Sequence, residues 1–261
     1  MNRFVIVVLL ALSMGLCAAC GDKESHVVIS GSTSVQPYIE ILAEEYAHLY
    51  PEKVVDVQGG GSSAGIMAVE SGIADIGMSS RLLKADEQHL WVIEIAKDGL
   101  ALIVHPDNPV SNLSLAQIRG IYAGEITSWR ELTGVNAKIH IIAREEGSGT
   151  RSAFEDLVMG DKRINPRAIV QSSNGAVRQL VSGDVNSIGF ISLGLVDETV
   201  KAVDLDGVSP EKENIINGSY SLYRPFLFIA QEEPAGFSAQ FIDFVLSPEG
   251  KGHMINEGLI P

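Results

Sequence analysis

The 261-residue chain has only two cysteines, Cys17 and Cys20, and both lie within its first twenty residues. The remainder of the chain therefore cannot form an internal disulfide. Aromatic residues are scarce, at 6% of the sequence, whereas glycine is frequent, with 26 residues. This composition is typical of an α/β protein with many tight turns between strands and helices, rather than of an all-β sandwich.

Basic residues are also few, because 19 Lys and Arg stand against 33 Asp and Glu, which gives a formal net charge of −14. A nucleic-acid-binding protein needs a basic face that neutralises phosphates along the strand, so we expect no nucleic-acid partner. A small anion is not excluded. Local donors hold a buried anion, whereas net charge mostly governs solubility and steering.

The hydrophobic run at residues 4–12 is too short to span a bilayer. It follows Arg3 and precedes small residues, which is the layout of a secretory signal. The end of this segment, from Cys17 to Cys20, resembles a lipobox, in which the final cysteine is lipidated and becomes the new N-terminus. We expect a signal peptide at residues 1–19 and a lipidated tether at residues 20–26; an ordinary signal peptide cut nearby is the alternative.

After the tether, short apolar segments alternate with helical patterns in a βα rhythm. Strands are expected at residues 27–30, 54–58, 74–78, 100–104, 139–143, 168–171, 188–191 and 227–230. Helices are expected between Pro37 and Pro51, from the loop at residues 59–63 to Gly72, and at residues 115–123, 152–159, 176–182, 238–246 and 251–257. The turn-rich residues 105–109 mark a point where the chain leaves one lobe.

Four junctions between a strand and a helix are built from glycine and small polar residues, at residues 31–34, 59–63, 147–150 and 172–175. The first backbone N–H groups of a helix have no helical partner and lie at the positive end of its dipole, so they attract anions. Each hydroxyl adds a donor. One such loop indicates only helix capping, but four in one chain favour an anion site.

Arg144 supplies a positive charge three residues before Gly147. Its planar guanidinium matches two oxygens of a tetrahedral oxyanion, so an arginine beside a helix N-terminus suits phosphate. The alternative is a salt bridge to Glu145 or Glu146. Both interpretations hold together if one glutamate orients the arginine.

Other chemistries have weaker support. The six histidines show no metal-ligand spacing and the sequence has no nucleotide P-loop, so no metal or cofactor is expected. The segment from Gly61 to Gly65 fits the nucleophile elbow of α/β-hydrolases, with Ser63 as nucleophile and Asp243 and His253 as partners. Those partners fall in the expected terminal helices rather than in loops. We therefore expect no enzymatic activity, with a secreted serine hydrolase as the alternative.

Several segments together resemble the substrate-binding protein of the phosphate ABC transporter, a member of the type II periplasmic-binding-protein family. They are Gly31 to Ser34, Gly60 to Ser63, and residues 75–81, 115–129, 144–150 and 241–250. The resemblance implies two α/β lobes, joined by two crossover strands, that close on a dehydrated phosphate in the cleft. Lobe 1 would comprise residues 27–105 and 224–261, and lobe 2 residues 106–223.

The resemblance also implies which residues bind phosphate. These are Thr33 and Ser34 in the first loop, Ser62 in the second, and Arg144, Ser148, Gly149 and Thr150 in the main anion-binding segment. Glu146 stands where the family has an aspartate that pairs with the binding arginine. In the best-known members of the family, an aspartate at this place accepts a hydrogen bond from the protonated phosphate and rejects sulfate, and here Ser80 takes its place, as a serine does in other members. Ser32, Ser63, Arg81 and Asn174 are weaker candidates.

The expected function is extracytoplasmic capture of inorganic phosphate by a monomer anchored to the membrane as a lipoprotein. The expected partner is the permease of a phosphate ABC transporter. A receptor for sulfate, molybdate or tungstate is the alternative within the same class, and a second role in reporting phosphate to a membrane sensor stays open.

Overall fold

The computed structural model describes residues 25–261, so the expected signal peptide and Cys20 lie outside the described residues. The main sheet has the strand order β2-β1-β3-β11-β4-β8-β6-β7, and β9 pairs with β4 beside this path. A separate small sheet joins β5 and β10. The strands are β1 (His26–Gly31), β2 (Val54–Gly59), β3 (Ile76–Ser79), β4 (Trp91–Val104), β5 (Asn112–Leu113), β6 (His140–Arg144), β7 (Ile169–Gln171), β8 (Ser187–Ser192), β9 (Lys201–Ala202), β10 (Asp204–Leu205) and β11 (Tyr223–Ala230).

Most helices occupy the connections between these strands, and the last two follow β11. They are α2 (Gln36–Leu49), α3 (Ser62–Glu70), α4 (Leu115–Ala123), α5 (Arg130–Thr133), α6 (Gly149–Phe154), α7 (Asn174–Ser182), α8 (Lys212–Ile216), α9 (Gly236–Leu246) and α10 (Pro248–Asn256), with short turns η1 (Ala85–Glu87), η2 (Glu155–Met159) and η3 (Leu193–Leu195). None of the helices between residues 25 and 261 is long and apolar enough to cross a bilayer.

Local sequence signals account for several helix boundaries. The helix expected at residues 115–123 is α4, which starts after the capping box of Ser114 and Gln117. It ends at Gly124, whose φ of 80° lies in the left-handed region that glycine adopts without strain. The prediction of this helix is confirmed at both ends.

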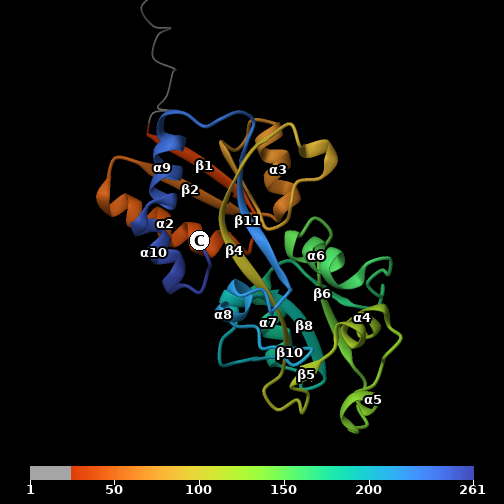
Figure 1. Ribbon diagram of the computed structural model, residues 1–261. Coiled ribbons are helices and arrows are strands. Elements are labelled where there is room, and N and C mark those ends of the chain that lie inside the picture. Colours follow the sequence, from red (N-terminus) through yellow and green to blue (C-terminus); the bar gives the residue numbers. More distant parts are fainter. Residues whose placement is uncertain (1–24) are drawn as a thin grey trace, which may run out of the picture.

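Two strands, β4 and β11, run side by side through the middle of the molecule and join two groups of elements (Figure 1). The first half of β4 pairs with β11 as far as Gly99, and the second half, from Leu100, pairs with β8. The first group contains β1 to β3 with α2, α3, α9 and α10. The second group contains β5 to β10 with α4 to α8.

The predicted strand at residues 100–104 is wrong in its start, because β4 begins at Trp91. Its early residues alternate between partly exposed and more buried positions and include Glu94, Lys97 and Asp98, so this half lacks a continuous apolar run. From Leu100 onward every residue of β4 is buried. Only that second half carries the signal of a fully buried strand.

Helices cover both faces of the sheet in each group, because successive side chains of a strand point to opposite faces. In β11, Phe226 and Phe228 pack into one hydrophobic cluster together with residues of α2, α9 and α10. Leu227 and Ile229 pack into another, with residues of α3. Thus α3 and the terminal helices lie on opposite faces of the first group (Figure 1).

The helix expected at residues 152–159 also needs correction. It starts earlier, as α6 at Gly149, and continues as the π-helical turn η2. Ser148 is its N-cap, and the Ser148 hydroxyl accepts a hydrogen bond from the backbone N–H of Arg151 at 3.3 Å. The first turn of α6 therefore contains Gly149 and Thr150, two of the predicted binding residues.

Candidate functional site

The glycine- and serine-rich loops of both groups meet at one place, at the carboxyl ends of parallel strands. Parallel strands end at the same edge of a sheet, so the loops that follow β1, β2 and β3 are neighbours, as are those after β6 and β7. The two sets of loops touch each other. The backbone N–H of Ser63 donates to the carbonyl oxygen of Gly147 at 3.1 Å, and the Ser34 and Thr150 hydroxyls lie 2.8 Å apart.

Arg144 lies at the centre of this contact and is only 1% exposed, although it is a charged residue. Its Nη2 donates to the Thr33 hydroxyl of the first group at 3.0 Å, and its Nη1 donates to Thr150 at 3.4 Å. Backbone carbonyl oxygens of Gln171 and Ser172 accept two further hydrogen bonds. The guanidinium is thus fixed by groups from three loops.

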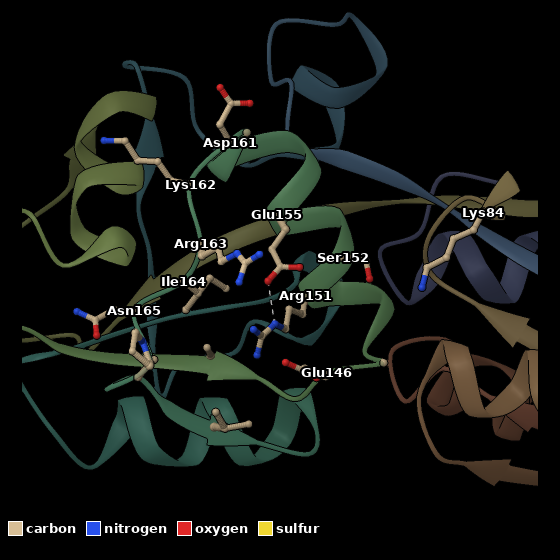
Figure 2. Close-up of a pocket in the computed structure, with 16 residues that line it drawn as sticks. Lys84, Glu146, Arg151, Ser152, Glu155, Asp161, Lys162, Arg163, Ile164 and Asn165 are labelled. Carbon is tan, nitrogen blue, oxygen red and sulfur yellow. Dashed lines mark hydrogen bonds and ion pairs between the residues drawn. The ribbon is translucent and has the colours of Figure 1, made fainter.

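Glu145, not Glu146, pairs with Arg144. The Glu145 carboxylate accepts from Nε and from Nη2 of Arg144, both at 2.9 Å. The assignment of this role to Glu146 is therefore wrong. The chain turns at residues 146 and 147, so the exposed side chain of Glu146 does not reach the guanidinium of Arg144. Glu146 is exposed and lines a cavity on the outer side of α6 (Figure 2).

Three serines from three loops of the first group form a buried hydroxyl cluster. Ser32 donates to Ser80 at 2.8 Å, Ser62 and Ser80 lie 3.4 Å apart, and the backbone N–H of Ser80 donates to Ser62 at 3.1 Å. All three side chains are buried. Ser80 and Ser62 therefore lie together, as the resemblance to the phosphate receptors requires.

Gly149 of the second group approaches this hydroxyl cluster so closely that a side chain would not fit. A Cβ atom at position 149 would lie 2.2 Å from Oγ of Ser62 and 2.4 Å from Oγ of Ser80. Real Cβ contacts below 3.0 Å essentially do not occur. The absence of a side chain at Gly149 is what lets the N-terminus of α6 meet the loops of the first group.

Among the weaker candidates, the side chain of Asn174 reaches the contact, whereas Ser63 takes part only through its backbone N–H and Arg81 lies beside it. The Asn174 amide donates to the Ser34 hydroxyl at 2.8 Å. Arg81 forms a two-pronged ion pair with Glu87, at 2.7 and 2.8 Å, and also donates to Ser63 at 3.3 Å. This pairing with Arg81 holds the pKa of the Glu87 carboxyl below its usual range.

The proposed partners of Ser63 in a hydrolase lie on the wrong face of the sheet. Asp243 and His253 belong to α9 and α10, which pack with α2, whereas Ser63 belongs to α3 on the opposite face. The Ser63 hydroxyl instead accepts a hydrogen bond from Arg81. These three residues do not assemble the catalytic triad that the elbow motif suggested.

Two charged residues that the sequence analysis missed lie next to the predicted site. Asp98 of β4 and Arg224 of β11 are each 2% exposed, and the carboxylate accepts from Nε and Nη2 of the arginine at 3.1 and 3.0 Å. Nη2 of Arg224 also donates to the Ser34 hydroxyl at 3.2 Å. The signal that was overlooked is a single arginine directly before the apolar residues of a strand, where a buried charge is unusual.

Burial disfavours both charged forms of this pair. It raises the pKa of the Asp98 carboxyl and lowers the pKa of the Arg224 guanidinium, while the attraction between the two groups acts in the opposite sense on each. Arg224 is thus a second buried guanidinium, besides Arg144, at the place where the loops of the two groups meet.

A cavity of about 720 Å³ opens beside the predicted site, on the outer side of α6 (Figure 2). Its lining mixes both signs of charge, with Lys84 from the first group and Glu146, Arg151, Glu155 and Arg163 from the second. Arg151 and Glu155 form an ion pair at 2.9 Å. The candidate binding hydroxyls of Ser34, Ser62 and Ser80 are not in its lining, so this cavity and the buried site are separate features.

Comparisons with known proteins agree with this architecture over nearly the whole chain. Residues 18–249 match a family model described as a PBP superfamily domain. A substrate-binding protein assigned to phosphate ABC transport in Clostridium perfringens, solved with bound phosphate, has 44% identity and a TM-score of 0.88, covering 90% of this chain and 99% of its own. An ABC-type phosphate transport receptor from Vibrio cholerae has 41% identity and a TM-score of 0.76, covering 90% and 99%. The phosphate-binding protein PstS of Bacillus subtilis is 29% identical over 283 residues, covering 100% of this chain and 94% of that protein.

Proposed function

The chain belongs to the PBP superfamily and, within it, to the PstS-type phosphate-binding proteins, and we propose that it captures inorganic phosphate and delivers it to an ABC transporter permease. Its fold is the type II periplasmic-binding-protein fold, as the resemblance in the sequence implied. The observation that carries the proposal is the buried Arg144, which donates to hydroxyls of both groups where their loops meet.

This arrangement suits capture without chemistry. A hydrogen bond to a charged group contributes about 1.5 to 3 kcal/mol. Roughly ten such bonds outweigh the cost of ordering and closure and leave micromolar or tighter binding, about −8 kcal/mol. The proposed ligand groups are the side chains of Thr33, Ser34, Ser62, Ser80, Arg144, Ser148 and Thr150 and the backbone of Gly149. No step of this function requires a nucleophile.

The proposed lobes are residues 27–105 with 224–261, and residues 106–223. The change of strand partner between Gly99 and Leu100 of β4, and the start of β11 at Tyr223, support two crossing strands as the hinge between them. Hinges are a few positions that absorb the change in backbone angles when two lobes close around a ligand.

The proposed location is the extracytoplasmic side of a membrane, with a monomer held there by a lipid on Cys20. The lipobox-like residues before Cys20 support this anchor. Labelling cells with a radioactive fatty acid tests it, because Cys20→Ser should lose the label while the folded domain is still produced. Retention of label in Cys20→Ser would contradict the anchor.

Calorimetric titration tests the proposed ligand directly. We expect the purified protein to bind phosphate with a Kd of about 1 μM or lower, and to bind sulfate and molybdate more weakly. Tighter binding of sulfate, molybdate or tungstate would favour the alternative oxyanion receptor.

Phosphate is also expected to raise the melting temperature, because only the folded protein binds it. At a concentration one hundred times Kd the stabilisation is about 2.7 kcal/mol, which corresponds to roughly 5 to 10 °C for a domain of this size. The measurement is a thermal melt of protein stripped of bound anion. Sodium chloride at matched ionic strength is the control, and an equal shift with chloride would contradict specific binding.

Ser80→Asp is expected to widen the preference for phosphate over sulfate by about tenfold or more. The Ser80 hydroxyl can donate or accept a hydrogen bond, whereas an aspartate only accepts and therefore repels sulfate, which has no proton to offer. Titrations with both anions in wild type and Ser80→Asp provide the ratio.

Ser80→Asn is the matched control for this prediction, because it has the size of aspartate without its charge. We expect the control to leave the ratio of the two affinities nearly unchanged. An unchanged ratio in Ser80→Asp as well would mean that position 80 does not face the ligand.

A further inference from the structure

Asp98 and Arg224 occupy directly paired positions on the two crossing strands. They lie 126 residues apart in the sequence, and each is almost completely buried. Removing two charges from water is costly, and apolar residues of similar volume often stabilise a fold as well as a buried ion pair does. The location of this pair, between the two groups and next to the loops, therefore calls for a functional explanation.

A closed ring of hydrogen bonds connects the pair to both groups. Arg224 donates to the Ser34 hydroxyl of the first group, and Asp98 accepts from the Ser192 hydroxyl of β8 at 2.7 Å. The Ser192 backbone N–H donates to the Asn174 side-chain oxygen at 3.3 Å, and the Asn174 amide donates back to Ser34. The ring thus includes the first binding loop, both crossing strands and the N-terminus of α7.

Arg224 has donor capacity that the protein leaves unused. Its Nε and Nη2 are engaged by Asp98 and Ser34, but its buried Nη1 has no hydrogen-bond partner among residues 25–261. A buried polar group without a partner is destabilising unless something else satisfies it. Because Nη1 and Nη2 share one carbon atom, this free donor lies at the end of the guanidinium that contacts Ser34.

Arg144 contacts the same small group of hydroxyls. Its Nη1 donates to Thr150, whose hydroxyl lies 2.8 Å from Ser34. Two guanidinium groups therefore approach one pair of hydroxyls from different elements, β6 and β11. Two like charges this near to each other repel in a dry site, and an anion that both can contact removes that repulsion.

We propose that Arg224 is a second guanidinium that binds the captured oxyanion, and that Asp98 is the residue that positions it. This inference rests on the proposed function and names a ligand contact that the resemblance to the phosphate receptors did not supply. Asp98 holds Nε and Nη2 on one side of the guanidinium, so that the remaining N–H groups face the loops. The ligand would then contact Arg144 of the second group and Arg224 of the crossing strand β11.

The test compares binding and stability in a variant that removes both charges together. Arg224→Gln alone would leave the buried Asp98 without its partner and destabilise the protein. The double variant Asp98→Asn/Arg224→Gln keeps similar side-chain volumes with no net change in charge. We expect it to fold and to bind phosphate about 10- to 100-fold more weakly. This is the change in Kd expected when one hydrogen bond to a charged group is lost.

The matched control is Asp197→Asn/Arg178→Gln, which removes an ion pair of 3.1 Å that is about one-third exposed and outside the candidate site. It should leave the Kd for phosphate unchanged. A purely structural role for Arg224 would alter the melting temperature of the site variant and leave its Kd at the wild-type value, and that result would overturn the proposal.

Arg224→Lys provides a second measurement if the double variant does not fold. Lysine keeps the positive charge opposite Asp98 but lacks the planar fork, so it cannot contact Asp98 and the ligand together. We expect at least a tenfold weaker Kd for phosphate with this variant, and wild-type affinity would overturn the proposal. Failure of the wild-type protein to bind phosphate would instead contradict the proposed function itself.

Discussion

Arg144→Ala is expected to abolish phosphate binding at micromolar concentrations while the protein stays folded. Removing one partner of a desolvated, hydrogen-bonded charge pair costs about 2 to 5 kcal/mol, which is roughly 30- to 5,000-fold in Kd. The proposed charge pair is Arg144 with the bound phosphate. Arg144 is buried and donates to Thr33 and Thr150, one from each group, so the pair would be desolvated and hydrogen-bonded. The measurement is a calorimetric titration of the variant with phosphate.

The fold should survive this substitution because no buried charge is left alone. Glu145, the partner of Arg144, keeps 27% of its side chain exposed and can be hydrated by solvent. The interaction of Arg151 with this segment also remains, since it uses the backbone carbonyl oxygen of Arg144. Thermal melts without phosphate should therefore resemble those of the wild type.

Two further variants separate the possible causes of lost binding. Arg163→Ala removes an exposed arginine from the neighbouring cavity and should leave the Kd unchanged, which tests for a general charge effect (Figure 2). Arg144→Lys retains the charge but not the fork and should bind with intermediate affinity. Wild-type affinity in a folded Arg144→Ala protein would exclude Arg144 from the site.

Gly149→Ala is expected to weaken phosphate binding by about 100-fold or more, through closure rather than through folding. The added methyl would lie 2.2 Å from Oγ of Ser62 and 2.4 Å from Oγ of Ser80, both across the contact between the two groups. Alanine is a good helix former, so the start of α6 itself should tolerate it. The variant should then fold normally but be unable to bring its loops together.

Gly175→Ala is the matched control, because Gly175 also lies in the first turn of a helix that follows a binding loop. A Cβ atom there would meet only Oγ of Ser173, at 3.9 Å, which is an ordinary contact. Titration with phosphate should give wild-type affinity for this control. Equal affinities for Gly149→Ala and Gly175→Ala would mean that the ligand-bound protein does not have the close contact at Gly149.

Small-angle X-ray scattering distinguishes a closure defect from a lost ligand contact. Wild-type protein should become more compact when phosphate is added, because binding draws the two groups together. Gly149→Ala should remain expanded at phosphate concentrations that compact the wild type. A normal compaction with weak binding would assign the effect to the ligand contact instead.

The sequence by itself determined most of the local structure. The βα rhythm after residue 26 predicted strands that correspond to β1, β2, β3, β6, β7 and β8, and the helix predicted at residues 115–123 has the bounds of α4. Those features depend on side-chain periodicity and on backbone preferences of a few neighbouring residues, which a single sequence displays directly. The resemblance to the phosphate receptors, carried by the loop sequences, extended this to the family and the fold.

Secondary structure without a strong local pattern was missed. The first half of β4 contains Glu94, Lys97 and Asp98, and it is a strand because β11 pairs with it. The short elements β5, β9 and β10 have two residues each. Such segments have too few residues for a periodic signal, and pairing with distant strands decides their conformation.

Only the tertiary structure decided how the binding residues are paired. Glu145 rather than Glu146 holds Arg144, because the direction of each side chain depends on the path of the chain after β6. Asp98 meets Arg224 through the register of two strands that are 126 residues apart in sequence. The sequence shows which donors the chain possesses, but their partners depend on register and on close approach in space, which no local pattern encodes.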